Sequence, residues 1–380
     1  MARFAVVVSS PIRAGLADAI AAGDAPKRDY FELRDRLNAE LMAPPETPGL
    51  AYSRLRKVGG NALAMAWIAW SRRDSYDVIV TDQEYTGLLL AMLSKLTRTK
   101  RGHVMISHYL TPAKKQVFFR LFRAQSHIDR TICYSSAQEK LALNTLKLRR
   151  DEVSMVLHPA DSAFWKPAAS TTEREADARM LREAGLDLPP ETPLVCSAGL
   201  EFRDYPTLMQ AARDLPQGVH MAIAASSPWS KRKNTTEDAE LPDNVHLVSL
   251  KPIELRALYR RAQVVAIPLY DVDFQAGSLV AYEAMACGRP VVITRTRGQS
   301  DIVRENETGY YVPAGDAGAM AAATNRLIAD PALSEKMGAN AREVVEHGLN
   351  LYKYLDDMCE IARNVAAKRE QKKVAVRITR

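Results

Sequence analysis

The chain has 380 residues, of which 47% are hydrophobic and 26% are charged, the composition of an ordinary soluble globular protein. This length suits two domains of roughly 150–200 residues each. No apolar run reaches the roughly 20 residues that span a bilayer, and the first one, residues 4–8, is too short for the core of a secretory leader, about 7–15 residues. The composition therefore excludes a membrane-spanning protein and predicts a cytoplasmic location.

The net charge of +7 is unevenly distributed along the chain. Residues 1–165 carry a net charge of +8 and residues 368–380 one of +5, so the remainder is negative, at −6. A basic first half suits an anionic partner that meets the N-terminal domain. Basic side chains scattered for solubility explain the same count, and both interpretations are open at this stage.

The four cysteines lack the spacing of a metal site. They are Cys133, Cys196, Cys287 and Cys359, each in an apolar or helical context. Buried, reduced thiols are therefore the predicted state.

Short β-branched runs in the first half have the length of buried parallel strands. They cover Arg3–Val8, Tyr76–Asp82, His103–His108, Ile128–Tyr134 and Val153–Leu157. Helical patterns lie between them, over residues 33–48, over residues 62–71 and up to residue 96. Trp67 and Trp70 in the second of these are expected in the core.

Side chains that follow these strands are candidates for ligand contacts, because the carboxyl ends of parallel strands border the crevice of such sheets. Arg13 and Gly15 lie in the loop after the first strand, and His108 ends the third. We assign Arg13 and Gly15 to the acceptor side by this position. An exposed arginine and a structural histidine are the ordinary alternatives.

The segment Lys114–Arg123 interleaves basic with aromatic side chains. On a helix, Val117 and Leu121 would face the core while basic side chains surround Phe119 or Phe122. Such a face could lie on an anionic bilayer, at the inner side of a membrane. A packed helix with a solvated rim explains it too. No nucleic-acid-binding motif accompanies the segment, so no nucleic-acid partner is expected.

Strands and helices alternate in the second half as well. A charged, alanine-rich segment, residues 168–193, suits an interdomain linker with one helix. Apolar strands follow over Leu194–Ala198, His220–Ala225, Val245–Leu250, Val264–Leu269 and Val291–Thr294. The polar residues 226–243 predict a mobile excursion. After Asp316 the pattern is helical to about residue 367, and the basic tail, residues 368–380, is expected to fray.

The most informative stretch runs from Val264 to Asp316 and reads as a parallel strand, helix, strand unit. Small residues at positions 276–278 let the backbone approach a ligand, and the start of the helix suits a phosphate. Glu283 lies eight residues after Gln275, a little over two helical turns, so both can border one site. An ordinary helix start in an α/β protein has the same pattern.

Three segments carry a more specific signal: Ser278–Val292, Gly309 and Pro313–Asp316. Together they resemble the donor-binding segment of retaining glycosyltransferases of the GT-B fold, the group similar to glycogen synthase and sucrose synthase. The resemblance implies an α/β chain with two doubly wound Rossmann-like domains facing a cleft. It implies an acceptor-binding domain over residues 1–167, a linker over 168–193, a nucleotide-sugar-binding domain over 194–345 and, over 346–380, a helix that crosses back to the first domain and a basic tail.

The resemblance implies donor-binding roles for Arg203, Gly277, Ser278, Leu279 and Glu283. Glu283 would accept hydrogen bonds from the ribose, and the others would bind the diphosphate. Arg203 takes the position of the family's lysine, and an ion pair with Asp204 or a neighbouring loop is its alternative. Leu200 stands where the family has an arginine, so one cation is missing.

The resemblance assigns His108 and Gln275 to the transferred sugar, as catalytic residues. Gln275 replaces the family's usual glutamate, and its amide can donate and accept hydrogen bonds but cannot act as nucleophile or base. Transfer with retention would then proceed by departure of the diphosphate and attack on the same face of the sugar, with a diphosphate oxygen taking the proton.

The predicted activity is therefore a glycosyltransferase acting, without cofactor or metal, on a nucleotide diphosphate sugar and a sugar-containing or anionic acceptor. Asp271 and Asp273 form an Asp-x-Asp pair, which binds metal in another glycosyltransferase fold, but two oxygen ligands make a weak site. The alternatives are a nucleotide-sugar epimerase of the same fold and a catalytically inactive nucleotide-sugar-binding protein.

Overall fold

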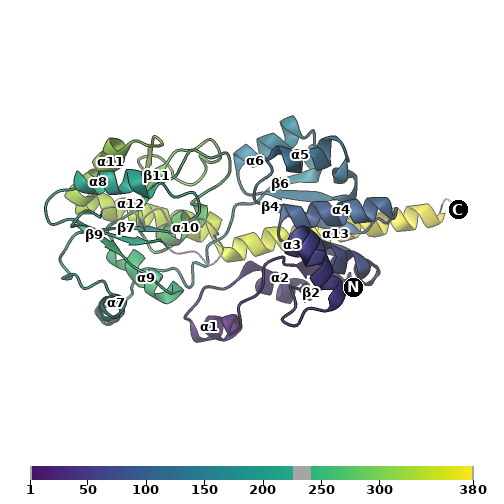
Figure 1. Ribbon diagram of the computed structural model, residues 1–380, viewed down its shortest axis with the longest axis horizontal. Helices are drawn as coiled ribbons and strands as arrows, with labels where there is room; N and C mark the ends of the chain where they lie inside the picture. The colour runs from purple at the N-terminus through teal and green to yellow at the C-terminus, as the bar shows by residue number, and fades with distance from the viewer. Residues whose placement is uncertain (1, 226–240, 379–380) are drawn as a thin grey trace. The chain divides into compact units, whose positions relative to one another are not determined.

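A computed structural model describes residues 2–225 and 241–378 (Figure 1). The chain divides into two compact units. The first comprises Met1–Ala17, Lys27–Leu157 and Tyr352–Arg380, and the second comprises Asp18–Pro26 and His158–Leu351. The predicted mobile excursion falls mostly on residues 226–240, which lie outside the described residues.

The first unit is built on a six-stranded parallel sheet, as far as the described residues extend. Its strand order is β2-β1-β3-β4-β5-β6. The strands are β1 (Phe4–Val7), β2 (Glu40–Met42), β3 (Val78–Thr81), β4 (Gly102–Ser107), β5 (Arg130–Cys133) and β6 (Val153–Met155). The direction of winding reverses between β1 and β3, where Val7 pairs with Thr81. The crevice outside the carboxyl ends at such a point is the usual ligand position in this class of sheet.

Helices cover this sheet and close its core. They are α2 (Asp29–Leu37), α3 (Leu50–Ser71), α4 (Glu84–Leu96), α5 (Ala113–Arg120), α6 (Ser136–Lys140) and α13 (Leu351–Ile378). Helix α1 (Leu16–Ala22) crosses the division, because its residues from Asp18 onward belong to the second unit. One buried cluster packs α3 and α4 on β1 and β3, and a second packs α4, α5 and the segment after α6 on β4 and β5. From Tyr352 onward α13 belongs to this unit, and the Tyr354 hydroxyl lies 3.0 Å from that of Tyr134.

The second unit has its own six-stranded parallel sheet in the described part of the chain, with the order β12-β11-β10-β7-β8-β9. Its strands are β7 (Leu194–Ala198), β8 (His220–Ala224), β9 (Val245–Leu247), β10 (Val264–Ile267), β11 (Val291–Thr294) and β12 (Gly309–Val312). Its helices are α7 (Thr171–Glu183), α8 (Tyr205–Arg213), α9 (Pro252–Arg261), α10 (Ser278–Ala286), α11 (Ala317–Ala329) and α12 (Pro331–Val344). The winding reverses between β7 and β10, the equivalent of the β1/β3 point.

These two sheets confirm the predicted fold class, two doubly wound Rossmann-like α/β domains. The strands were recognisable because parallel strands covered on both faces are continuous apolar runs, and β1, β3, β7, β10 and β11 are buried along their whole length.

The structure corrects the predicted segment at residues 33–48. Helix α2 ends at Leu37 because Asn38 adopts a left-handed conformation, with φ of 48°, and the chain then forms the short edge strand β2. Helix α3 starts at Leu50, twelve residues before the predicted helix, and its two halves meet at a break at Gly59 and Gly60. Trp67 is 39% exposed, so its assignment to the core was wrong.

The structure also corrects the predicted frayed tail. Helix α13 continues through residues 368–378. Its Arg369 forms an ion pair of 2.7 Å with Asp129, and both side chains are mostly buried. A tertiary contact that the sequence pattern could not reveal therefore extends the helix into the basic tail.

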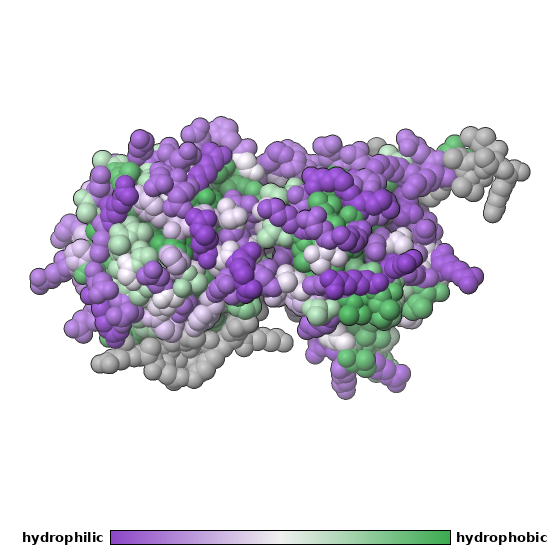
Figure 2. Space-filling model, turned by 90° about the horizontal axis from the view of Figure 1, so that it is seen from above, coloured by the Kyte–Doolittle hydropathy of each residue, from purple (hydrophilic) through white to green (hydrophobic). Residues whose placement is uncertain are grey.

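The surface seen in Figure 2 is mostly hydrophilic, interrupted by smaller hydrophobic areas. Among the described residues, no helix combines the length and the apolar character that a membrane crossing requires.

Candidate functional site

Two loops pack against each other where the winding of the second sheet reverses. Residues 199–204 follow β7, residues 268–277 follow β10, and the two strands are neighbours. Arg203 and Leu269 form an antiparallel bridge, and the Tyr270 N–H donates to the Phe202 carbonyl at 3.1 Å. The ring of Phe202 meets that of Phe274 edge-on, with centroids 4.9 Å apart. The two loops therefore support each other at the carboxyl edge of the sheet.

Helix α10 begins at this edge, and Gly277 is the residue before its first turn. Gly277 has φ of +77°, and a Cβ there would stand 3.0 Å from Ile267 Cγ2, so the turn favours glycine on two grounds. No side chain caps the helix and its first turn contains no acidic residue. Ser278 is nearly buried, with its hydroxyl donating to the Gln275 carbonyl at 3.3 Å, whereas Leu279 is 38% exposed. The first N–H groups of α10 have no partner within the helix and carry its positive dipole end.

Glu283 lies on the second turn of α10 and is buried, with 7% of its surface exposed. The Tyr259 hydroxyl from α9 donates to its Oε2 at 3.3 Å. Burial raises the pKa of Tyr259 well above its ordinary value, and the nearby Glu283 carboxylate raises it further, so this phenol stays protonated as a donor. The carboxylate is thus held in place by α9.

Arg203 is turned inward, with 5% of its surface exposed. Its Nε donates to the Ala198 carbonyl and its Nη1 to the Glu201 carbonyl, each at 2.9 Å. A Cβ on Gly199 would stand 2.7 Å from Nη2, so glycine makes room for the guanidinium. Burial lowers the pKa of Arg203, and the negative groups that oppose this include Glu283. The Arg203 guanidinium is therefore close enough to the Glu283 carboxylate for the two charges to interact.

The alternative considered for Arg203, an ion pair with Asp204, does not form. The Asp204 carboxylate instead caps α8, accepting from the Thr207 N–H at 3.2 Å and from the Thr207 hydroxyl at 2.7 Å. Asp204 thus anchors the helix that follows the loop, and Arg203 packs against the backbone of the loop itself.

Gln275 precedes α10 and is also nearly buried. Its Nε2 donates to the hydroxyl of Tyr282, a fully buried residue on the first turns of α10, at 3.4 Å. The structure therefore brings Gln275, Arg203, the start of α10 and Glu283 to one edge of the second sheet, as predicted donor-binding and catalytic residues of one site require.

Sequence reasoning missed the loop after β11, which supports this edge. Gln299 is buried and its Nε2 donates to the Ala276 carbonyl at 3.1 Å, just before α10. A Cβ on Gly298 would stand 2.1 Å from the Phe274 nitrogen, so the two loops pack backbone to backbone. The signal available in the sequence was a glycine at the carboxyl end of a buried strand.

In the first unit, a polar cluster that the sequence analysis also missed occupies the β1/β3 point. The Ser9 N–H and hydroxyl donate to the Asp82 carboxylate at 3.2 and 3.1 Å, and the Gln83 amide donates to the Ser9 hydroxyl. Burial raises the pKa of Asp82 to about 6, against the opposing effect of the Ser9 hydrogen bonds. Ser9 and Asp82 are 73 positions apart, so their spacing gave no signal.

His108 follows β4 directly and is exposed at the same edge. Its Nε2 lies 2.9 Å from the Asp82 carbonyl, and its ring meets that of Tyr134 edge-on at 4.9 Å. Its backbone N–H donates to Glu84 at 3.0 Å. Arg13 and Gly15 lie in the exposed loop between β1 and α1, and Gly15 has φ of +73°. The residues predicted for the donor thus lie in the second unit, and His108, Arg13 and Gly15 lie in the first.

The segment Lys114–Arg123 is arranged differently from the prediction. Phe119 faces the core and is almost fully buried, whereas Val117 and Leu121, expected in the core, are 41% and 71% exposed. Lys115 is not a surface cation: its Nζ pairs with Glu84 at 2.5 Å, and both side chains are 6% exposed. The helical face was assigned wrongly because the buried ion pair draws Lys115 inward.

The Asp-x-Asp pair and the cysteines show no arrangement for binding a metal in the described part of the chain. Asp271 pairs with Arg297, whose Nε lies 2.9 Å from its carboxylate. No group of three or more histidine, cysteine, aspartate or glutamate side chains within the described ranges could hold a metal ion. The four cysteines are free and buried, as predicted, and burial raises the pKa of Cys133 and of Cys287 to about 12.

Comparison with known proteins identifies the second half of the chain. Residues 189–344, which contain every donor-side residue described above, match the family model described as Glycosyl transferases group 1. This part of the chain is therefore similar to the group 1 glycosyl transferases. The resemblance recognised in the sequence is therefore confirmed.

Relatives and solved structures extend the comparison beyond this domain. A D-inositol 3-phosphate glycosyltransferase from Xylanimonas cellulosilytica is 32% identical over 176 residues, which cover 44% of this chain and 42% of that protein. Sucrose-phosphate synthase from Thermosynechococcus elongatus superposes with a TM-score of 0.72 at 21% identity, covering 97% of this chain and 100% of that one. The Anabaena protein HepE, solved with UDP-glucose, gives 0.69 at 15% identity, with coverage of 97% and 100%. At such identities the structures establish the GT-B fold of this chain and no more.

Proposed function

We propose that this chain transfers a sugar from a nucleotide diphosphate sugar to an acceptor, with retention of configuration. The observation that carries the proposal is the open start of α10 at the β7/β10 point, free of any acidic residue and followed on the second turn by buried Glu283. Helix starts of this kind bind phosphate groups, and a carboxylate at this distance suits the two ribose hydroxyls.

The names of similar proteins support a nucleotide-sugar donor. HepE was solved with UDP-glucose and with UDP and glucose, and the relative from Xylanimonas is named a glycosyltransferase. In this chain, Arg203 and the N–H groups of residues 277–279 would stabilise the negative charge that builds on the departing diphosphate.

Gln275 decides the course of the transfer. Its amide can orient a sugar hydroxyl but cannot form a covalent glycosyl intermediate as a carboxylate would. The bond from the anomeric carbon to the diphosphate therefore breaks as the acceptor oxygen attacks the same face, and a diphosphate oxygen takes the acceptor's proton. No metal takes part in this course, and activity is expected to persist in a chelator.

The acceptor is assigned to the first unit, with Arg13 and Gly15 as its contacts, and His108 of the same unit is assigned to the transferred sugar. A sugar-containing or anionic acceptor suits the basic first half of the chain. The exposed apolar residues Val117 and Leu121 support peripheral contact of the segment Lys114–Arg123 with a membrane, expected at its cytoplasmic face. Flotation with vesicles of anionic and of neutral lipid tests that contact, and equal recovery with both argues against it.

A donor panel followed by mass spectrometry tests the activity, since slow donor hydrolysis needs no acceptor. Glu283→Gln keeps the size of the side chain and loses its charge, so it should lower hydrolysis and donor affinity together by about tenfold or more. Glu307→Gln, a change at an exposed glutamate, is the matched control and should behave as the parent chain. Equal activity in both variants would remove Glu283 from the site.

The same panel separates the other functions of this fold. Release of a free epimerised sugar would identify an epimerase. Tight nucleotide binding with no hydrolysis of any donor would identify an inactive binding protein. The family assignment of residues 189–344 favours the transferase over both.

A further inference from the structure

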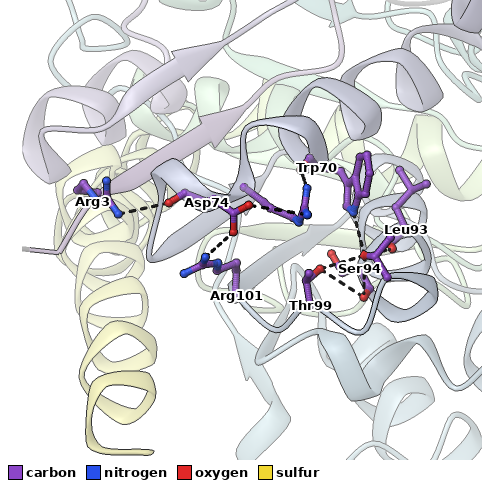
Figure 3. A network of polar contacts seen from close by, with 9 residues as sticks. Arg3, Trp70, Asp74, Leu93, Ser94, Thr99 and Arg101 are labelled. Carbon is purple, nitrogen blue, oxygen red and sulfur yellow. Dashed lines mark hydrogen bonds and ion pairs between the residues drawn. The ribbon is translucent and has the colours of Figure 1, made fainter. Parts of the chain in front are cut away.

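A second polar hollow lies at the opposite, amino-terminal edge of the first sheet. It is bordered by the start of β3 and β4, by the chain after α3 and by the chain after α4 (Figure 3). Its polar lining consists of Arg73, Ser94, Thr99, Arg101, His103 and His127. None of these residues belongs to the predicted donor or acceptor site.

Two guanidinium groups in this hollow share one carboxylate. Arg101 Nη2 lies 2.5 Å from Asp74, and Arg73 Nη2 lies 3.8 Å from the same carboxylate, whose side chain is 65% exposed. Arg73 also donates to the Trp70 carbonyl at 2.8 Å and stacks over the Trp70 ring. Its Nε is buried and has no hydrogen-bond partner among the residues that the structure describes. Burying a charged donor without an acceptor costs free energy, so an anion that accepted a hydrogen bond from this nitrogen would be stabilised.

The surrounding charges are mainly positive. Burial lowers the pKa of His127, and Lys100, Lys95 and Arg369 lower it further, with only Asp129 opposing them. Asp129 is already paired with Arg369 at 2.7 Å. The Lys95 ammonium donates to the Phe122 carbonyl at 2.6 Å and meets no carboxylate within the described part of the chain. An anion entering the hollow would therefore meet a favourable potential.

The remaining polar lining includes two hydroxyl groups, those of Ser94 and Thr99. Thr99 accepts or donates a hydrogen bond with Thr97 at 3.1 Å, and Trp70 donates to the Thr97 hydroxyl at the same distance. Figure 3 shows Trp70, Ser94 and Thr99 on one side of this network and Asp74 with Arg101 on the other. The enclosed part of the hollow is only about 10 Å³, room for about one water molecule, so an anion would bind at its mouth, where the side chains of Arg73 and Arg101 meet the solvent.

We propose that this hollow binds a phosphate group, as inorganic phosphate or as the phosphate of a monoester, through Arg73 and Arg101. Two guanidinium forks match the geometry of phosphate oxygens, and the third oxygen can accept from a hydroxyl of the lining. The site is separate from the donor site, so the proposal does not rest on the proposed activity.

Phosphate titration of the full chain tests this, followed by the His127 ring resonances in NMR at constant ionic strength with chloride as reference. A saturable rise of the His127 pKa is expected, because the bound dianion offsets Lys95, Lys100 and Arg369. His127→Gln assigns the resonance. Donor-site binding of phosphate leaves this local probe unchanged. The absence of a saturable change with phosphate would overturn the proposal.

Charge variants sharpen the result. Arg73→Gln and Arg101→Gln should each weaken phosphate binding about ten- to hundredfold, and Asp74→Asn should tighten it by removing the resident negative charge. Arg72→Gln is the matched control, because Arg72 is a neighbouring exposed arginine paired with Glu40. Unchanged binding in Arg73→Gln and Arg101→Gln chains that retain their melting temperature, or equal weakening by Arg72→Gln, would contradict the assignment.

Three ligands distinguish the source of the phosphate group. Inorganic phosphate, a hexose monophosphate and vesicles of phosphatidic acid, compared with phosphatidylcholine vesicles, are each applied to the parent chain and to Arg73→Gln. The ligand whose affinity falls most in the variant is the preferred one. A fall for none of the three would again overturn the proposal.

Discussion

The two sheets place a helix start at the same topological point, yet the two starts differ in chemistry. In the first unit α4 begins directly after β3, and Asp82 and Glu84 put two carboxylates of the protein at its N-terminus. In the second unit α10 begins after β10 with glycine before it and no acidic residue in its first turn. Topology therefore decides where a ligand edge lies, and the residues at the helix start decide whether an external anion can bind there.

The carboxylates at α4 are held by partners from elsewhere in the first unit. Glu84 pairs with Lys115 on α5, and Asp82 accepts hydrogen bonds from Ser9 after β1. Near α10 the charged side chain is instead a cation, Arg203, and the carbonyls of Ala198 and Glu201 hold it in place. At the edge of the first sheet, which we call the closed edge, carboxylates of the protein occupy the helix start. At the edge of the second sheet, the open edge, the helix start has no such carboxylate, so an anionic ligand could bind there.

The largest expected effect concerns the closed edge. Glu84→Gln removes the counter-charge of buried Lys115 and should lower the free energy of unfolding of the first unit by about 3–5 kcal/mol. Urea unfolding monitored by hydrogen exchange measures it. In the double variant with Lys115→Met, a neutral pair replaces the ion pair, and most of the loss should be recovered. A loss below about 1 kcal/mol in the single variant would mean that the ion pair is not what closes this edge.

The open edge is tested by Arg203. Arg203→Met should weaken nucleoside diphosphate binding about a hundredfold, because a cation beside the diphosphate is lost, and Arg203→Lys should lie between the two. Titration calorimetry measures the affinity. Arg213→Met, at an exposed arginine on α8, is the control. If both methionine variants bind equally well, Arg203 serves only the fold of the loop.

The raised pKa of Asp82 predicts how the stability of the closed edge changes with pH. Burial raises the Asp82 pKa from 3.8 to about 6, so between these values the folded chain binds more protons than the unfolded one. Stability due to Asp82 is therefore present at low pH and lost as pH rises through about 6. Asp82→Asn should thus gain about 2–3 kcal/mol relative to the parent between pH 4 and pH 7.

A carboxylate of opposite behaviour provides the control for this measurement. Arg101 lowers the pKa of exposed Asp74, so its contribution is lost as pH falls rather than as it rises. Denaturant unfolding at matched pH values compares Asp82→Asn with Asp74→Asn. A pH-independent difference between Asp82→Asn and the parent would mean that Asp82 is ionised in both states, and the closed edge would then be fully charged.

The contrast between the units also explains what the sequence could reveal. Strands such as β3 and β10 were predictable because a run buried on both faces is apolar throughout. The three-residue edge strand β2 was not, because it is partly exposed and follows a helix without a proline or glycine signal. Helix α13 exceeded its predicted end because Arg369 finds Asp129 some 240 positions away.

The residues proposed for the donor side could be selected from the sequence because a single segment contains most of them, from Gln275 to Glu283. The Ser9 and Asp82 cluster was missed because it joins the ends of two strands that are far apart in sequence. The inward orientation of Arg203 likewise depends on the fold of its loop against residues 268–270, which no spacing within that loop encodes. Local motifs therefore located the open edge, and tertiary pairing created the closed one.

The smallest expected effect tests whether the open edge depends on its helix caps. Asp204→Ala removes the cap of α8, and Ser135→Ala removes the cap of α6 in the first unit, where Ser135 accepts from the Gln138 N–H at 3.3 Å. Each should cost about 1 kcal/mol of stability. Only Asp204→Ala should also weaken nucleoside diphosphate binding, by a few-fold, because α8 follows the Arg203 loop directly. Equal affinities in the two variants would show that the carbonyls of Ala198 and Glu201 alone hold Arg203, with no contribution from the helix behind it.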